Sequence, residues 1–125
     1  MSYLPTFAQV FIAIAMFDVW LLRYNRPQRA RGGNATTMAE EFAVYGLPVW
    51  FRNVIRVLKL ASGTLMILGI WNDRLAVIAG VSLVVLMGGA IAMHIKVRDP
   101  LYKSIPATTF FLLSAYVAYT HWPSG

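Results

Sequence analysis

Residues 75–95 read LAVIAGVSLVVLMGGAIAMHI and contain no Asp, Glu, Lys or Arg. A helix needs about 20 predominantly apolar residues to cross the hydrocarbon core of a bilayer. Stretches of similar length and apolar character occur at residues 7–24, 50–71 and 105–122. Lipid offers no hydrogen-bond partner to an unpaired backbone, so each stretch is expected to be a helix. The sequence therefore predicts an all-α fold, a polytopic membrane protein whose single domain, residues 1–125, is an antiparallel four-helix transmembrane bundle.

The composition supports the same class. Hydrophobic residues make up 58% of the chain and charged residues 13%, which is roughly half the charge of a soluble domain. This balance argues against a soluble globule, and also against disorder, which requires low hydrophobicity and high charge. The chain has no cysteine, which excludes disulfides, thiol catalysis and iron–sulfur clusters. No cluster of residues has the spacing of metal ligands, so no metal site is expected.

The basic residues predict how the chain is oriented. All Lys and Arg residues except Arg74 lie in or near the connections between spans one and two and between spans three and four. Basic loops stay on the cytoplasmic side. We therefore expect a multi-pass protein of the cell inner (cytoplasmic) membrane, or of an organelle membrane with these loops in the matrix or stroma, and both termini on the outer side. Arg26, Arg29 and Arg31 are expected to bind anionic lipid headgroups. Nucleic acid is not an expected partner, because the chain shows no groove-reading element.

A short helix is expected between the first two spans. Thr37 and Glu40 have the spacing of a capping box, in which the Thr side chain caps the helix and the Glu reaches back. Gly46 suits the position just after a helix, and Pro48 suits the first turn of the next one. We predict a helix over about residues 38–45 that lies at the inner membrane interface.

Charged residues inside the spans need a physical reason, because each costs roughly 2.5–3.5 kcal/mol at the centre of a membrane helix. Asp18 and Arg56 each lie about six residues, or roughly 9 Å, from the inner end of their span. The two spans run in opposite directions, so we expect these side chains to meet as a charge-assisted pair. Two interpretations stay open: the pair fixes helix packing alone, or it faces a ligand.

Other polar residues fall on the same side of the membrane. Lys59 shares a helical face with Arg56, and Glu41 can reach that face from the short helix. His94 closes the third span and Lys103 opens the fourth. The sequence therefore predicts a polar basin that opens to the inner interface.

His94 has more than one possible role. A haem would require a second His at the same depth, but His121 lies at the outer end of its span. The interpretations left open for His94 are an interfacial hydrogen-bonding residue and a contact for a proton or a quinone.

Span three carries a stripe of small residues at a spacing of four, interrupted by Val84, which favours close helix packing. Packing within the bundle and a homodimer contact are both consistent with it. The stripe consists of Ala76, Gly80, Gly88 and Ala92.

A resemblance to a known family rests on motifs in a fixed order along the chain. They are Glu40-Glu41-Phe42, Tyr45-Gly46-Leu47-Pro48-x-Trp50, Lys59-Leu60, Leu68-Gly69-Ile70-Trp71, Met87-Gly88-Gly89-Ala90, His94 and Lys103-x-x-Pro106-Ala107. In this order they resemble the DoxX-like family of small four-helix membrane proteins. The resemblance implies a four-helix bundle, with Glu41, Tyr45, Lys59, His94 and Lys103 as the site. Members of the family are linked to quinone-dependent sulfur oxidation, to membrane redox complexes and to receptor assembly, and fold alone transfers none of these activities.

Two functions are expected from these observations. The first is a non-catalytic accessory or assembly subunit of a larger membrane complex, which binds membrane lipid and a protein partner in the membrane or a second copy of itself. The alternative is a quinone-binding subunit of a membrane redox complex. No catalytic residue and no cofactor site is evident, and quinone is the ligand kept open. A small transporter is disfavoured, because the chain shows no internal repeat.

Overall fold

The computed structural model describes residues 3–22, 32–33, 35 and 37–123. The described residues form helices and connections and contain no strand. The elements in chain order are α1 (Leu4–Phe17), a π-helical segment (Asp18–Leu22), α2 (Met38–Tyr45), α3 (Val49–Leu68), α4 (Asp73–Lys96), a 3-10 turn (Leu101–Ser104) and α5 (Ile105–His121). The predicted headgroup contacts Arg26, Arg29 and Arg31 lie outside the described residues.

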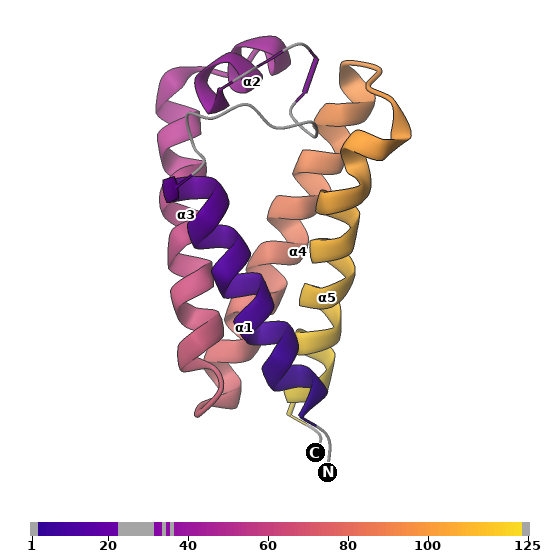
Figure 1. Cartoon of the computed structure of the whole chain (residues 1–125). Coiled ribbons are helices and arrows are strands. Elements are labelled where there is room, and N and C mark those ends of the chain that lie inside the picture. The colour runs from indigo at the N-terminus through magenta and orange to yellow at the C-terminus, as the bar shows by residue number, and fades with distance from the viewer. Residues whose placement is uncertain (1–2, 23–31, 34, 36, 124–125) are drawn as a thin grey trace.

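The long helices α1, α3, α4 and α5 lie side by side, with α2 across one end and both termini at the other (Figure 1). Helix α4 packs against α3 and α5, and α1 packs against the same two helices from the other side. Each long helix contributes a fully buried residue to the core between them. These residues are Ile12, Met66, Leu83 and Val117.

Two segments meet the length and hydropathy of a membrane-spanning helix among the described residues. They are Leu4–Leu22, with a mean hydropathy of 1.7, and Asp73–Lys96, with a mean hydropathy of 2.5. Helix α5 has 17 residues, and α3 carries Arg52, Arg56 and Lys59 within its 20. The spanning of α3 and α5 therefore stays a prediction.

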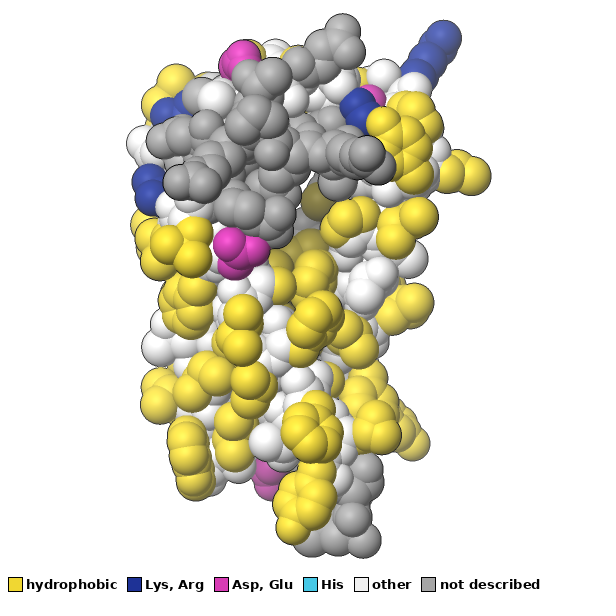
Figure 2. All heavy atoms as spheres, viewed as in Figure 1, with side chains coloured by type: hydrophobic (Ala, Val, Ile, Leu, Met, Phe, Trp, Pro, Cys, Tyr) yellow, Lys and Arg dark blue, Asp and Glu magenta, His cyan; other side chains and the backbone are white. Residues whose placement is uncertain are grey.

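Apolar and basic side chains occupy different parts of the surface along the long axis of the molecule. Hydrophobic side chains predominate on the described surface below the α2 end in Figure 2, and the Lys and Arg side chains in view lie toward that end. Large apolar and aromatic side chains stand out from the helices, among them Phe7 (71% exposed), Val85 (68%) and Tyr119 (81%). Soluble proteins rarely expose apolar patches on this scale.

Local signals account for the short helix α2. The Thr37 side chain accepts a hydrogen bond of 3.2 Å from the backbone N–H of Glu40, and the predicted bounds coincide with Met38–Tyr45. Gly46 follows with φ 78°, a left-handed conformation that glycine adopts without a steric cost. This turn leads the chain from α2 into α3, and α2 buries Met38, Phe42 and Tyr45.

Candidate ligand-binding cavity

A cavity of about 910 Å³ lies between α2 and the four long helices; we call it the main cavity. Its walls are largely apolar, with Phe11, Phe51 and Phe110 among the lining residues. Six of the seven residues predicted for the inner basin also line it; Arg56 does not. The six are Asp18, Glu41, Tyr45, Lys59, His94 and Lys103. Ligand pockets in proteins typically measure about 300–1,000 Å³.

Helix α2 brings Tyr45 and Glu41 to the cavity. The hydroxyl of Tyr45 donates a hydrogen bond of 2.6 Å to Oε1 of Glu41, one helical turn earlier. Nζ of Lys96 donates to the backbone carbonyl of Tyr45 at 2.7 Å, which satisfies a carbonyl at the end of α2. This contact ties the end of α2 to the end of α4.

His94 is paired with Asp99, a residue that the sequence analysis did not single out. Nδ1 of His94 lies 2.7 Å from Oδ2 of Asp99, and the two side chains are 6% and 4% exposed. Between them Arg98 has φ 58°, a left-handed conformation that is uncommon for a residue with a Cβ. The backbone N–H of Asp99 then donates to the carbonyl of His94 at 3.0 Å. The tight turn after α4 thus returns Asp99 to the ring of His94.

Asp99 also contacts Gly33, which precedes α2 in the chain. Its Oδ1 accepts a hydrogen bond of 2.9 Å from the N–H of Gly33 and lies 3.8 Å from Nζ of Lys103. Lys103 in turn donates to the carbonyl of Gly33. Burial alone would raise the pKa of Asp99, but the hydrogen bonds from His94 and Gly33 and the charge of Lys103 outweigh it and lower the pKa below its usual value. Asp99 is therefore ionised at neutral pH.

Lys59 brings a positive charge to the wall of the cavity. The residue is 8% exposed, and its Nζ lies 4.7 Å from the centre of the Trp20 ring. A cation over an indole face is attracted by the negative charge density of the ring. The ring of Phe42 in α2 is nearly perpendicular to that of the same Trp20, with centres 6.2 Å apart, so Trp20 contacts both α2 and the Lys59 ammonium.

The π-helical segment contains Asp18 and is contacted by Arg56 of α3. Asp18 begins the segment and lines the cavity. Nε of Arg56 donates a hydrogen bond of 3.1 Å to the carbonyl of Trp20. Isolated π-helical turns leave the regular pattern of helix hydrogen bonds and often occur at functional sites. The ion pair between Asp18 and Arg56 stays a prediction.

The small residues of α4 face different surroundings. Ala76 and Gly80 are buried, Gly88 is half-buried and Ala92 is exposed. A Cβ on Gly80 would lie 2.8 Å from the carbonyl oxygen of Ser114 in α5. Ala76 lies against Gly69 at the end of α3, and a Cβ on Gly88 would lie 3.6 Å from Phe111 of α5. Most of the stripe thus packs within the bundle, while Ala92 is exposed and leaves the homodimer contact open.

The second histidine lies at the far end of the molecule. Nε2 of His121 lies 3.9 Å from Oδ1 of Asp73, and Asp73 is the first residue of α4, whereas His94 is in its last turn. The two histidines are thus separated by the length of α4 and do not share a site.

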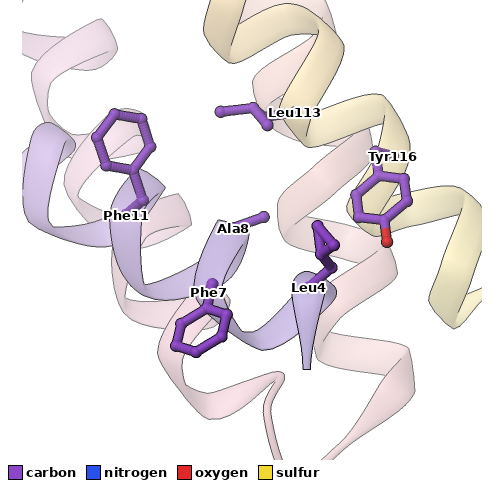
Figure 3. Close-up of a pocket in the computed structure, with 6 residues that line it drawn as sticks. All are labelled: Leu4, Phe7, Ala8, Phe11, Leu113 and Tyr116. Atoms are coloured by element: carbon purple, nitrogen blue, oxygen red, sulfur yellow. The ribbon is translucent and has the colours of Figure 1, made fainter. Parts of the chain in front are cut away.

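A smaller hollow, which we call the lateral groove, lies between α1 and α5 near the end that carries the termini. It measures about 420 Å³ and is lined by Leu4, Phe7, Ala8, Phe11, Leu113 and Tyr116 (Figure 3). Phe11 lines both hollows and stacks on Phe110 with ring centres 5.6 Å apart. The sequence analysis missed this groove, because its residues read simply as apolar span. Its lining suits a hydrocarbon chain and offers little hydrogen bonding.

Comparisons with known proteins show one similar protein and one matching family. The uncharacterized protein YdgD of Bacillus subtilis (strain 168) is 37% identical to this chain over 79 residues, which cover 62% of this chain and 69% of that protein. No solved structure matches the chain. The profile of the DoxX-like family matches residues 30–118, which include α2 to most of α5 and every predicted basin residue except Asp18. Together with the two apolar helices, this match indicates a membrane protein, and the chain belongs to the DoxX-like family.

Proposed function

We propose that α1, α3, α4 and α5 all cross the membrane as an antiparallel bundle, with α2 along the inner interface. The exposed apolar side chains along the helices support this arrangement, because they would face lipid. The gathering of Lys and Arg at the end that carries α2 supports an inner location for that end, in keeping with the positive-inside rule. The main cavity then opens in the inner half of the bilayer.

The function of the protein, in this proposal, is to bind a quinone-class molecule in the main cavity as a subunit of a membrane redox complex. The observation that carries it is the cavity itself, where an apolar volume of about 910 Å³ meets the polar groups of Tyr45, Lys59 and His94. A quinone has the same division, since a ring with two oxygens that need hydrogen bonds is attached to a hydrocarbon tail. Pockets that are mostly apolar with a few convergent polar groups are typical small-molecule sites.

The accessory role predicted from the sequence is compatible with this proposal. A quinone-binding subunit exchanges electrons with a redox centre, and in this proposal a partner subunit supplies that centre. A purely structural assembly factor remains the alternative. The quinone-binding role and the assembly role are distinguished by whether the purified protein retains a quinone or a protein partner.

The test is to purify the protein in a mild detergent, extract it with organic solvent and identify bound quinones by chromatography and mass spectrometry. We expect a quinone close to equimolar with the wild-type protein. The variant His94→Ala should lose most of it, because a polar contact of the headgroup is removed. The matched control is His121→Ala, which removes a histidine from the opposite end of the bundle and should retain the wild-type amount.

The proposal fails if the wild-type protein carries no quinone and takes none up from a quinone-loaded membrane. A stoichiometric protein partner in such a quinone-free preparation would favour the assembly role. Equal loss in His94→Ala and His121→Ala would show that the loss reports damage to the fold and not removal of a ligand contact.

A further inference from the structure

The hydrogen bonds of Asp99 determine which nitrogen of His94 carries a proton. Oδ1 of Asp99 faces two donors, the backbone N–H of Gly33 and Nζ of Lys103. Oδ2 faces Nδ1 of His94 at 2.7 Å. An ionised carboxylate can only accept hydrogen bonds, so Nδ1 of His94 is the nitrogen that bears the hydrogen.

The other ring nitrogen of His94, Nε2, is available to a ligand in the main cavity. When a neutral imidazole has its hydrogen on Nδ1, Nε2 carries a lone pair and accepts hydrogen bonds. Nε2 of His94 makes no hydrogen bond within the described part of the chain, and His94 lines the main cavity. The ring stands nearly perpendicular to that of Tyr45, with centres 6.0 Å apart, and this packing restricts its rotation.

The neighbouring donors are directed elsewhere. The ammonium group of Lys103 donates to the carbonyl of Gly33 and lies next to the carboxylate of Asp99. The hydroxyl of Tyr45 donates to Glu41. Nε2 of His94 therefore offers a lone pair to the ligand, and the ammonium of Lys59, which lies over the Trp20 ring, remains a donor in the cavity wall.

We infer that Asp99 is a positioning residue that holds His94 with Nε2 as a hydrogen-bond acceptor, so that the main cavity favours the hydroxyl-bearing, reduced form of its ligand. This inference rests on the proposed function and deepens it: the ligand class becomes a quinol, whose hydroxyl donates to His94. A quinone carbonyl in the same place would bring its lone pair against that of Nε2.

The variant Asp99→Asn tests the inference, because the geometry predicts which way the amide turns. Its oxygen stays with the two donors, Gly33 N–H and Lys103, and its NH₂ group then faces His94. That NH₂ group donates to Nδ1, which must give up its hydrogen, so His94 changes to the Nε2–H tautomer. Replacing a histidine-orienting Asp by Asn is known to produce the wrong tautomer in this way.

The first readout is the tautomer itself. In protein labelled with ¹⁵N-histidine, NMR of the wild type at a pH where His94 is neutral should show the Nδ1–H form for His94. Asp99→Asn should change it to the Nε2–H form, while the signals of His121 stay where they are. A wild-type His94 in the Nε2–H form overturns the inference without any variant being needed.

The second readout is ligand preference, measured anaerobically with decylhydroquinone and decylbenzoquinone as probes. Wild-type protein should bind the hydroquinone about tenfold more tightly, since one mispaired hydrogen bond has roughly that effect. Asp99→Asn should abolish or reverse the preference. Asp73→Asn is the matched control, because it alters the other Asp–His contact at the far end of α4, and it should keep the wild-type preference.

Each failure has its own meaning. If the wild-type protein binds neither probe, the proposed function is wrong. If it binds both but equally, or if Asp99→Asn keeps the wild-type preference, the proposed function stands and the role of Asp99 is overturned.

Discussion

At the scale of single residues, Asp99 joins two neighbouring elements, the end of α4 and the 3-10 turn, to a residue far away in the sequence. It contacts His94 at the end of α4, Lys103 in the 3-10 turn, and Gly33, which lies 66 residues earlier. Its side chain is almost fully buried, and a buried carboxylate is tolerated only where donors surround it. The residue therefore fixes His94 and Lys103, which both line the main cavity, from behind the cavity wall.

The lowered pKa of Asp99 predicts a loss of stability in acid. The unfolded chain binds the proton more readily than the folded protein does, so protonation favours unfolding. The contribution of Asp99 is complete above its unfolded-state pKa of about 3.9 and is lost as the pH falls below that value. Thermal unfolding in detergent, followed by tryptophan fluorescence as the pH is lowered, should show a falling Tm in this range.

Comparison with two variants assigns this acid transition. Asp99→Asn should lower the Tm at neutral pH and reduce the further decrease in acid, because the titrating group is gone. Asp73→Asn should leave the wild-type profile unchanged, since its side chain is 81% exposed. If Asp99→Asn and the wild type lose the same Tm between neutral and acid pH, Asp99 does not cause the transition.

At the scale of elements, the approach of α4 to α5 is set by one glycine. A Cβ on Gly80 would lie 2.8 Å from the carbonyl oxygen of Ser114 and 2.9 Å from Cβ of Ala118. Small residues allow helix backbones to come this close, which is a main source of helix association in lipid. Further along the same helix, a Cβ on Gly89 would meet nothing within 4 Å.

These two glycines provide a matched pair of variants. Gly80→Ala should destabilise the protein by about 1–3 kcal/mol, because α4 and α5 must move apart to admit the methyl group. Gly89→Ala should be neutral or stabilise by up to about 1 kcal/mol, because alanine is the better helix former. Thermal or denaturant unfolding in detergent measures both. Equal effects of the two substitutions would contradict the close contact between α4 and α5.

At the scale of the whole molecule, the polar and apolar residues are separated along the bundle axis. The main cavity and its charged lining lie toward α2, and the lateral groove and both termini lie toward the opposite end. Phe11 lines both hollows, so a ligand with its polar group at His94 has an apolar wall along its length. The proposed orientation places the polar group near the inner interface.

Cysteine labelling tests that orientation, and the chain has no cysteine of its own to interfere. Trp71→Cys and Leu101→Cys place single thiols at exposed positions beyond the two ends of α4, where the native residues are 78% and 88% exposed. In spheroplasts of an expressing bacterium, a membrane-impermeant maleimide should label the first from outside. It should label the second only after lysis. The reverse pattern would invert the proposed topology, and labelling of both from outside would mean that α4 does not cross the membrane.

Much of the framework could be predicted because helices depend on local sequence. The length of the apolar runs placed the long helices, and Thr37, Glu40 and Gly46 placed α2 to the residue. Charges inside apolar runs drew attention to Asp18 and Lys59, and His94 and Lys103 followed from their positions at helix ends. All four line one cavity in the folded chain.

The partners of these residues depended on folding. Asp99 lies in a polar connection, where an acidic residue carries no signal, and its role exists only because the left-handed Arg98 turns it back toward His94 and Gly33 approaches from far away in the chain. Gln9 is another residue of this kind: it is fully buried and donates to the carbonyl of Met66 across the α1–α3 contact. Hydrophobic run length and capping act within a few residues, so they can be read in order along the chain. A hydrogen bond between residues far apart in the sequence depends on how the helices pack. It therefore cannot be predicted from the position of either residue in the sequence.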